Sequence, residues 1–285
     1  MSSPAPARLP GPSPARPGAA SPALAAGLRV VRRGRDRVQV GLTEPRRTVL
    51  PRTAAVERVL DALQRGEAPA DDPATATVLD TLHDHGCLAA PAYGLPATSG
   101  PLVALRPAVR ELPVDPEQLL VAAGLRPTRW EHRAEAVLVV SDGEPAREPL
   151  DPLLRDGVPH LLLSFVDGGA RLGPFVVPGR TACQRCLDSH LGEDDPEHLA
   201  VLTRYVEATA APRPDGRDDL DDPGLVTLAV GWAVREVAAY LRGDEPATWS
   251  TTLTWHAGAP HPVTRRWLRR PGCGCGWAVS GTMDP

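Results

Sequence analysis

Two closely spaced pairs of cysteines constrain this sequence more than any other feature. Cys183 and Cys186 form a C-x-x-C pair in "TACQRCLDSH", and Cys273 and Cys275 form a C-x-C pair in "RRPGCGCGW" near the end of the chain. Four thiolates, two from each of two segments, suit tetrahedral zinc, and the glycines beside the second pair let backbone amides approach the sulfurs. We therefore predict a structural zinc site at these four cysteines. Because four sulfur ligands close the coordination shell, the metal would join the two segments and not catalyse a reaction.

Other interpretations of the thiols stay open at this point. A disulfide and free thiols are two of them, and a lone C-x-x-C pair is also typical of a thioredoxin-like redox centre, which would leave the C-x-C pair unexplained. His190 and His198 flank the first pair. Four cysteines already saturate a tetrahedral site, so neither histidine is expected as a ligand. The fifth cysteine, Cys87, is expected to be a small buried hydrophobe.

Length and composition limit the class of protein. A chain of 285 residues predicts two compact units with linkers, and a net charge of −4 gives no overall attraction for nucleic acid or an anionic membrane. All 31 basic residues are arginine, so lysine chemistry is excluded. No apolar stretch reaches the roughly 18 residues of a membrane span, and prolines interrupt every candidate signal sequence in residues 1–26. We interpret that segment as a disordered Pro/Ala-rich tail and expect a cytoplasmic protein.

Residues 27–90 are predicted to form a small module of about three strands and two helices. Alternation in "LRVVRRGRDRVQVGL" predicts a hairpin, and "RTVLP" predicts a third strand. Helical spacing predicts one helix in "RTAAVERVLDALQRG", capped by Thr53 and stopped by Gly66. A second helix is predicted in "DDPATATVLDTLHDHGCL", capped by Asp71 or Asp72.

The rest of the chain predicts an α/β domain. Residues 91–135 are rich in proline and are interpreted as a linker and an abbreviated subdomain with one helix candidate, "DPEQLLVAAG". Residues 136–278 begin with "AVLVV" and "PHLLLSFV", two apolar runs typical of buried parallel strands joined by a helix. A strand in "DGGARLGPFVVPG", a long apolar helix in "GLVTLAVGWAVREVAAYLRG" and an antiparallel pair in "TWSTTLTWHAG" and "PVTRRWLRR" follow. The acidic "APRPDGRDDLDDPG" is expected to be a solvated loop, and residues 279–285 a tail.

The pattern "GPFVVPGRTACQRCLDSH", followed by the late "PGCGC", resembles the ThiF-like, ubiquitin-activating-enzyme-like superfamily. Within it, the sequence is most similar to the bacteriocin cyclodehydratase-associated proteins that bind the leader peptide of TOMM precursors in actinobacterial gene clusters. The resemblance covers about residues 136–276. In such proteins an N-terminal winged-helix-like module, the RiPP recognition element, binds the leader peptide, and residues 27–90 have a similar layout.

The resemblance implies a fold, a function and partners. We expect a winged-helix-like module followed by a truncated ThiF-like, Rossmann-type domain with the zinc site. The expected function is that of a non-catalytic adaptor in azoline-type RiPP biosynthesis, which presents the precursor to a YcaO-like or other modifying enzyme; a homodimer is compatible with this role. The leader would add as a strand. The expected peptide-binding residues are Arg46, Arg47, Thr48, Val49, Leu50, Leu79 and Leu82, with arginines facing acidic leader residues.

Two rival functions stay open. One is an ATP-dependent cyclodehydratase or adenylyltransferase component. Adenylating members of the superfamily carry G-x-G-x-x-G after their first strand and use an arginine and a lysine on the triphosphate, whereas this sequence has no such glycine motif before residue 136 and no lysine. ATP binding is therefore not expected, and Asp142, at the end of a strand, is the one candidate for a catalytic residue. The other rival is a zinc-containing winged-helix transcription regulator, which the acidic composition disfavours.

Overall fold

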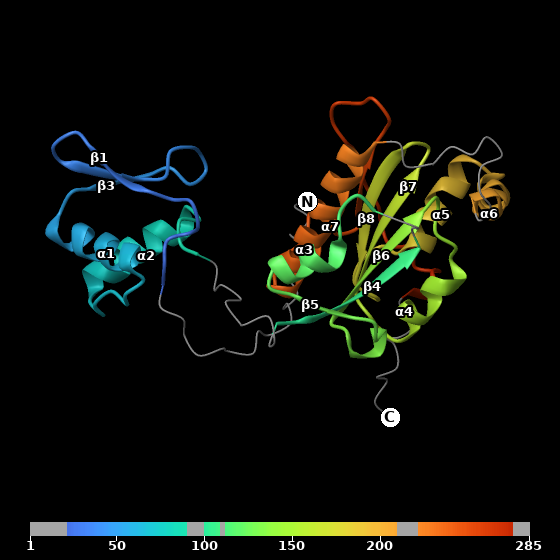
Figure 1. Cartoon of the computed structure of the whole chain (residues 1–285), viewed down its shortest axis with the longest axis horizontal. Coiled ribbons are helices and arrows are strands. Elements are labelled where there is room, and N and C mark those ends of the chain that lie inside the picture. The colour runs from blue at the N-terminus through green and yellow to red at the C-terminus, as the bar shows by residue number, and fades with distance from the viewer. Residues whose placement is uncertain (1–21, 90–99, 109–111, 210–221, 276–285) are drawn as a thin grey trace, which may run out of the picture. The chain divides into compact units, whose positions relative to one another are not determined.

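The chain is described here from a computed structural model that covers residues 22–89, 100–108, 112–209 and 222–275 (Figure 1). These residues belong to two compact units, one before residue 90 and one after residue 99, and each is described by itself. The predicted C-terminal tail, most of the predicted N-terminal tail and most of the predicted acidic loop lie outside the described residues.

The first unit is a three-stranded antiparallel sheet followed by two helices. Strands β1 (Val30–Arg33), β2 (Arg37–Val40) and β3 (Thr48–Pro51) pair in the order β1-β2-β3, with Val30 opposite Val40 and Val40 opposite Thr48. Helices α1 (Ala54–Arg65) and α2 (Pro73–Asp84) follow. The predicted hairpin, third strand and two helices are confirmed.

The ends of both helices follow from capping chemistry. The Thr53 hydroxyl accepts a hydrogen bond from the Val56 amide at 3.3 Å, and Gly66 ends α1 with φ of 70°, a conformation that glycine adopts without strain. The Asp72 carboxylate accepts the Thr75 amide at 2.8 Å, so Asp72 and not Asp71 caps α2. Each helix buries one side against the sheet, and the core includes the fully buried Cys87 that the sequence predicted.

The second unit is built on a seven-stranded mixed sheet in the order β10-β9-β8-β7-β6-β4-β5. Its strands are β4 (Leu102–Ala108), β5 (Arg126–Thr128), β6 (Ala136–Asp142), β7 (His160–Val166), β8 (Gly169–Val176), β9 (Thr251–Trp255) and β10 (Val263–Arg266). β5, β4, β6 and β7 are parallel, and β8, β9 and β10 extend the sheet antiparallel to their neighbours. In the sheet, β5 lies on one side of β4, and the next strand along the chain, β6, lies on the other side of β4. The carboxyl ends of β4 and β6 therefore flank the switch point at which such sheets bind ligands.

Helices cover both faces of this sheet (Figure 1). They are α3 (Pro116–Ala122), α4 (Asp151–Arg155), α5 (Gln184–Asp194), α6 (His198–Thr209) and α7 (Pro223–Leu241), with short 3-10 turns η1 (Glu131–Arg133) and η2 (Glu148–Leu150). α3 and α7 lie on one face, where Leu161, Leu163 and Phe165 of β7 meet α7. α4 lies on the other, where Leu153 packs near Leu162. The predicted strand-helix-strand unit and the antiparallel pair β9–β10 are confirmed.

The longest helix, α7, forms the centre of the larger core. Eight of its residues are buried, among them Ala229, Val230, Ala233 and Val237. Within the described residues α7 is the one helix whose length and composition would suit a membrane span. Because its most apolar side packs on the sheet, we assign it as a core helix of the kind that passes the same test.

The prediction for residues 91–135 was wrong in one respect. β4 is an internal strand of the sheet, paired with both β5 and β6, so the sheet starts at Leu102 and not at Ala136. Pro107 disguised this strand in the sequence, since proline lacks the N–H that an internal strand donates. The structure accommodates Pro107 because β5 pairs with β4 only as far as Ala104, which leaves Pro107 with one neighbouring strand.

His160 makes the stability of this unit dependent on pH. Burial lowers the pKa of His160 from 6.5 to about 4, and the ring bonds the Val158 carbonyl at 2.9 Å. Since the folded state disfavours the protonated ring, this contribution is complete above pH 6.5 and is lost as the pH falls toward 4. We expect the free energy of unfolding to fall by about 2 kcal/mol more between pH 7 and pH 5 in the wild type than in His160→Asn.

Urea unfolding of both proteins at the two pH values measures this difference. Asparagine keeps an N–H donor for Val158 but does not titrate, so it isolates the ionisation of the ring. Equal losses in the two proteins would contradict the assignment.

Candidate functional site

The four predicted cysteines meet in one cluster. Their sulfur atoms all lie within 4.8 Å of one another. The Cys183 sulfur lies 3.8 Å from that of Cys186 and 3.5 Å from that of Cys273, and the sulfurs of Cys186 and Cys275 are 3.7 Å apart. A tetrahedral ion with bonds of about 2.3 Å to sulfur requires sulfur–sulfur distances of about 3.8 Å. The cluster therefore fits a tetrahedral metal ion, and the distances are too long for a disulfide, consistent with five free cysteines.

Local structure presents these sulfurs to one another. Cys183 is the N-cap residue of α5, and its carbonyl accepts the Cys186 amide at 3.0 Å, which brings the two side chains to the same helix end. The second pair lies in the turn after β10. The Gly179 amide donates to the Cys275 carbonyl at 2.8 Å and the Arg270 amide donates to the Cys186 sulfur at 3.4 Å, so each segment is also held by the other's backbone. A small apolar cluster that includes Leu187 and Trp267 surrounds the sulfurs.

Electrostatics within the cluster favour ligation. Hydrogen bonds from the thiols of Cys183 and Cys275 hold the pKa of Cys186 well below its usual range, while the hydrogen bond to Cys186 raises the pKa of Cys183. One thiolate is thus already stabilised before a metal binds, and the remaining thiols exchange their protons for the metal charge. His190 is not a ligand, because its Nε2 bonds the Leu268 carbonyl at 2.9 Å.

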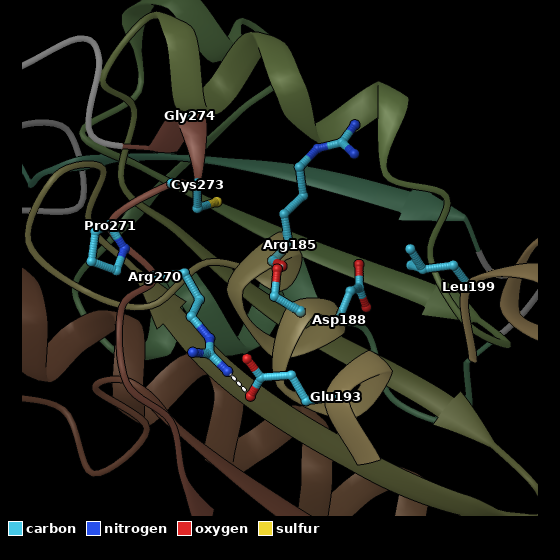
Figure 2. A pocket seen from close by; sticks show the side chains of 10 residues that line it. Arg185, Asp188, Glu193, Leu199, Arg270, Pro271, Cys273 and Gly274 are labelled. Carbon is cyan, nitrogen blue, oxygen red and sulfur yellow. Dashed lines mark hydrogen bonds and ion pairs between the residues drawn. The ribbon is translucent and has the colours of Figure 1, made fainter. Parts of the chain in front are cut away.

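A surface pocket of about 610 Å³ lies beside the cluster (Figure 2). Cys273, the least buried of the four cysteines, lines it. Its charged residues already have partners: Arg270 pairs with Glu193, Arg185 with Asp151 at 2.8 Å, and Asp188 with Arg147 at 2.7 Å. The pocket exposes one edge of the candidate metal site to solvent and offers no uncompensated charge to a ligand.

Asp142 ends β6, at the carboxyl edge of the parallel strands as predicted. Gly143 follows with φ of 79°, and a Cβ there would lie 2.9 Å from the Thr209 hydroxyl, so only glycine fits this turn. Next comes a buried network in which Glu144 contacts Arg147 at 2.7 Å and also Arg171 and Gln184. Arg147 in turn makes a two-bond contact to Asp188 of α5, at 2.8 and 2.7 Å. Burial alone would lower the pKa of Arg147, but its acidic partners raise it above its usual value. Burial alone would raise the pKa of Glu144, but the two arginines hold it below its usual value.

The residues present do not fit a nucleotide triphosphate at the first strand-helix turn. In the fold class, phosphate binds to free amides at a glycine-rich helix start. Here residues 109–115 contain no glycine. The first amides of α3 are already engaged, because the Asp115 carboxylate accepts the Glu117 amide at 2.8 Å and the Gln118 amide at 3.4 Å. A negative side chain therefore occupies the position that a phosphate would need.

The residues predicted to bind a peptide divide into two groups in the structure. Arg46 and Arg47 are exposed, and Val49 and Leu79 are half-buried. Thr48, Leu50 and Leu82 are buried, and Leu82 is fully enclosed in the core of the unit, so its side chain cannot line an open groove. Helical spacing identified a buried face correctly but does not distinguish a core from a binding surface.

Comparison with known proteins gives a fold and no family. No protein-family model and no curated protein sequence matches this chain. Among solved structures, the heterocyclase TruD matches with a TM-score of 0.66 at 21% identity, over 90% of this chain and 43% of that one. A heterocyclase in complex with substrate and cofactor matches at 0.64 and 19%, over 90% and 39%. MccB of E. coli, solved with AMPCPP and MccA, matches at 0.56 and 11%, over 90% and 99%.

These identities establish a shared fold for both units and leave activity open. The chain spans less than half the length of the two heterocyclases it matches.

The cysteine cluster predicts a metal content. We expect about one equivalent of tightly bound metal in the wild type, and a large loss in Cys183→Ser, because a hydroxyl replaces one of four thiolates. Zinc is the ion that the sequence predicts. Elemental analysis by mass spectrometry of the purified proteins measures it.

Cys87→Ser is the matched control, since Cys87 is buried in the other unit. It should keep the full metal content. A wild-type protein with four reduced, metal-free thiols after preparation without chelators would contradict the site.

Proposed function

We propose that this chain is a leader-peptide-binding adaptor in the biosynthesis of a ribosomally made, modified peptide. The first unit, which we interpret as a winged-helix-like recognition module, binds the leader of the precursor. The second unit, held by a structural zinc ion, brings that complex to a separate modifying enzyme such as a YcaO-like protein. The likeness of the whole described chain to heterocyclases and to MccB supports a role in this kind of biosynthesis.

The observation that carries the proposal is the outer edge of β3. Among residues 22–89, no strand pairs with β3 on the side away from β2. An unpaired edge offers N–H and C=O groups to an added strand. Cys87 occupies the start of this edge: its thiol donates to the Arg46 carbonyl at 3.2 Å and lies 3.3 Å from the Thr48 hydroxyl, so in this proposal the added strand pairs from Val49 onward. Val49, half-buried, and Leu79, half-buried on α2, supply apolar contacts.

Charge around this edge favours an acidic peptide. Residues 28–52 contain eight arginines and two acidic residues, whereas residues 53–89 contain seven acidic residues. Arg46 is exposed, and Arg47 is exposed beside Glu44 at 2.7 Å. Arginine binds carboxylates through paired N–H donors, so acidic leader residues would find partners immediately before β3.

The second unit supports the adaptor role because its residues suit a structural metal ion and do not suit a nucleotide triphosphate. Its helix start at Asp115 does not fit a triphosphate. The metal site fits a four-sulfur structural ion, for which Cys183, Cys186, Cys273 and Cys275 are the ligands. In this proposal the ion stabilises the domain and the modifying chemistry belongs to the partner enzyme.

Peptide binding, measured by fluorescence anisotropy, tests the proposal. The probe is a labelled synthetic leader of a short precursor peptide, which is to be sought among the neighbouring genes. We expect saturable binding to the wild type, and about tenfold weaker binding to Arg46→Glu/Arg47→Glu, because two attractive charges become repulsive. The wild-type affinity should also fall as salt is added.

Arg58→Glu is the matched control. Arg58 is exposed on α1 and lies outside the predicted peptide-binding residues, so this reversal should leave binding unchanged. No binding to the wild type, with binding to another protein of the same cluster, would overturn the proposal. ATP turnover by the purified chain would instead support the enzyme hypothesis.

A further inference from the structure

One of the four cysteines in the candidate metal site is open to small molecules from solvent. Cys183, Cys186 and Cys275 are buried, whereas Cys273 is only partly buried. Cys273 also lines the surface pocket of about 610 Å³, which has room for small solutes (Figure 2). Of the four sulfurs, that of Cys273 is therefore the one that a dissolved reagent meets first.

Metal ligation would keep the Cys273 sulfur reactive. The thiolate, and not the thiol, is both the form that binds a metal and the form that attacks an oxidant. A zinc ion bound by the four sulfurs would hold Cys273 deprotonated at neutral pH. The susceptibility of a cysteine to oxidation follows its thiolate character and its exposure, and Cys273 would combine the two.

A second cysteine lies close enough to complete an oxidation that begins at Cys273. The Cys273 sulfur is 3.5 Å from that of Cys183, compared with 3.8 Å between Cys183 and Cys186 and 3.7 Å between Cys186 and Cys275. A disulfide requires the two sulfurs to approach to about 2 Å. Cys273 follows Gly272, where an added Cβ would meet nothing within 4 Å, so the turn has room to adjust.

We propose that Cys273 is an oxidation site and that a hydroperoxide converts the metal site into a disulfide between Cys273 and Cys183. The Cys273 thiolate attacks one oxygen of hydrogen peroxide, the O–O bond breaks, and the departing hydroxide takes a proton from solvent to become water. The Cys183 thiolate then attacks the sulfur of the new sulfenic acid. The S–S bond forms, and the S–O bond breaks to release a second hydroxide, which is also protonated to water. Two thiolates are oxidised and one peroxide is reduced.

This disulfide would preserve the connection that the metal makes. Cys183 and Cys273 are 90 residues apart in the chain and belong to different pairs, so a bond between them joins the start of α5 to the turn after β10, as the ion does. Only Cys186 and Cys275 would remain as ligands, too few for a closed four-sulfur site, and the ion would leave. A disulfide from Cys183 to Cys186 would instead free the turn.

This inference rests on the metal site and goes beyond the proposed function. Peptide binding at β3 takes place in the other unit, so either proposal can fail without the other.

Peroxide titration of the full-length, zinc-loaded protein tests the proposal. A chromogenic chelator follows the released zinc, and mass spectrometry after cleavage at arginine maps the disulfides. We expect zinc release together with a link between the Cys183 peptide and the C-terminal peptide. Arg185 lies between Cys183 and Cys186, so cleavage there separates these two cysteines, and fragmentation at Gly274 assigns the second partner to Cys273. A dithiol reductant with added zinc should restore the metal-bound form.

Ser189→Trp tests whether the oxidant enters through the pocket. Ser189 lines the pocket from α5, so a large side chain there should slow zinc release by at least about threefold. Arg204→Trp is the matched control, because Arg204 is exposed on α6 and does not line the pocket. It should release zinc at the wild-type rate, and equal rates in all three proteins would overturn the pocket as the entry.

Thermal melting tests the consequence for the fold. The oxidised, metal-free protein should melt at least about 5 °C above the reduced protein stripped of metal by a chelator, because the disulfide closes a long loop. A disulfide between Cys183 and Cys186, or zinc that stays bound in excess peroxide, would overturn the proposal. A purified protein without zinc would overturn it too, because the reaction begins at metal-bound thiolates.

Discussion

The second unit depends on the contact between its four thiols. Cys183 and Cys186 stand at the start of α5, directly after β8, and Cys273 and Cys275 stand after β10. Between the two pairs the chain forms most of α5, then α6, α7, β9 and β10. A metal ion bound by the four thiols would close that whole segment into a loop, and closing a long loop removes much of the entropy of the unfolded chain. The Arg270 amide, which donates to the Cys186 sulfur, already holds the turn after β10 beside α5.

A second constraint lies at the carboxyl edge of the sheet, where enzymes of this fold class bind ligands. Here the turn after β6 is filled by charges that pair with one another. Arg147 links Glu144, in the same turn, to Asp188 on α5. Buried charges are tolerated when all are paired, and losing one partner is strongly destabilising because the others remain buried. This network therefore fixes α5, and with it the first cysteine pair, against β6. The turn after β6, which lies where related folds bind ligands, is thus occupied here by ion pairs within the protein.

The sequence predicted elements whose signals are local. Thr53, Asp72 and Gly66 marked helix ends through capping chemistry, and the apolar runs of β6 and β7 and the long α7 were recognisable by pattern. β4 was missed because of Pro107, and no helix was assigned to α5 or α6, whose stretch "LGEDDPEH" interrupts helical periodicity. The cysteine cluster was predictable because thiols in close pairs have few uses. The network around Arg147 was not, because its partners come from a turn, a strand and a helix that only the fold brings together.

The Asp115 carboxylate distinguishes this domain from nucleotide-binding domains of the same fold class, because it occupies the amides at the start of α3. Its carboxylate is tethered to the helix whose amides it occupies, so an incoming phosphate would compete with a covalently attached anion at very high effective concentration. Replacing Asp115 alone would remove this internal competitor but would leave a loop without glycine and a chain without lysine. A triphosphate site at this helix start would therefore require several changes in the sequence at once, because removal of the Asp115 carboxylate supplies neither the glycines nor the lysine.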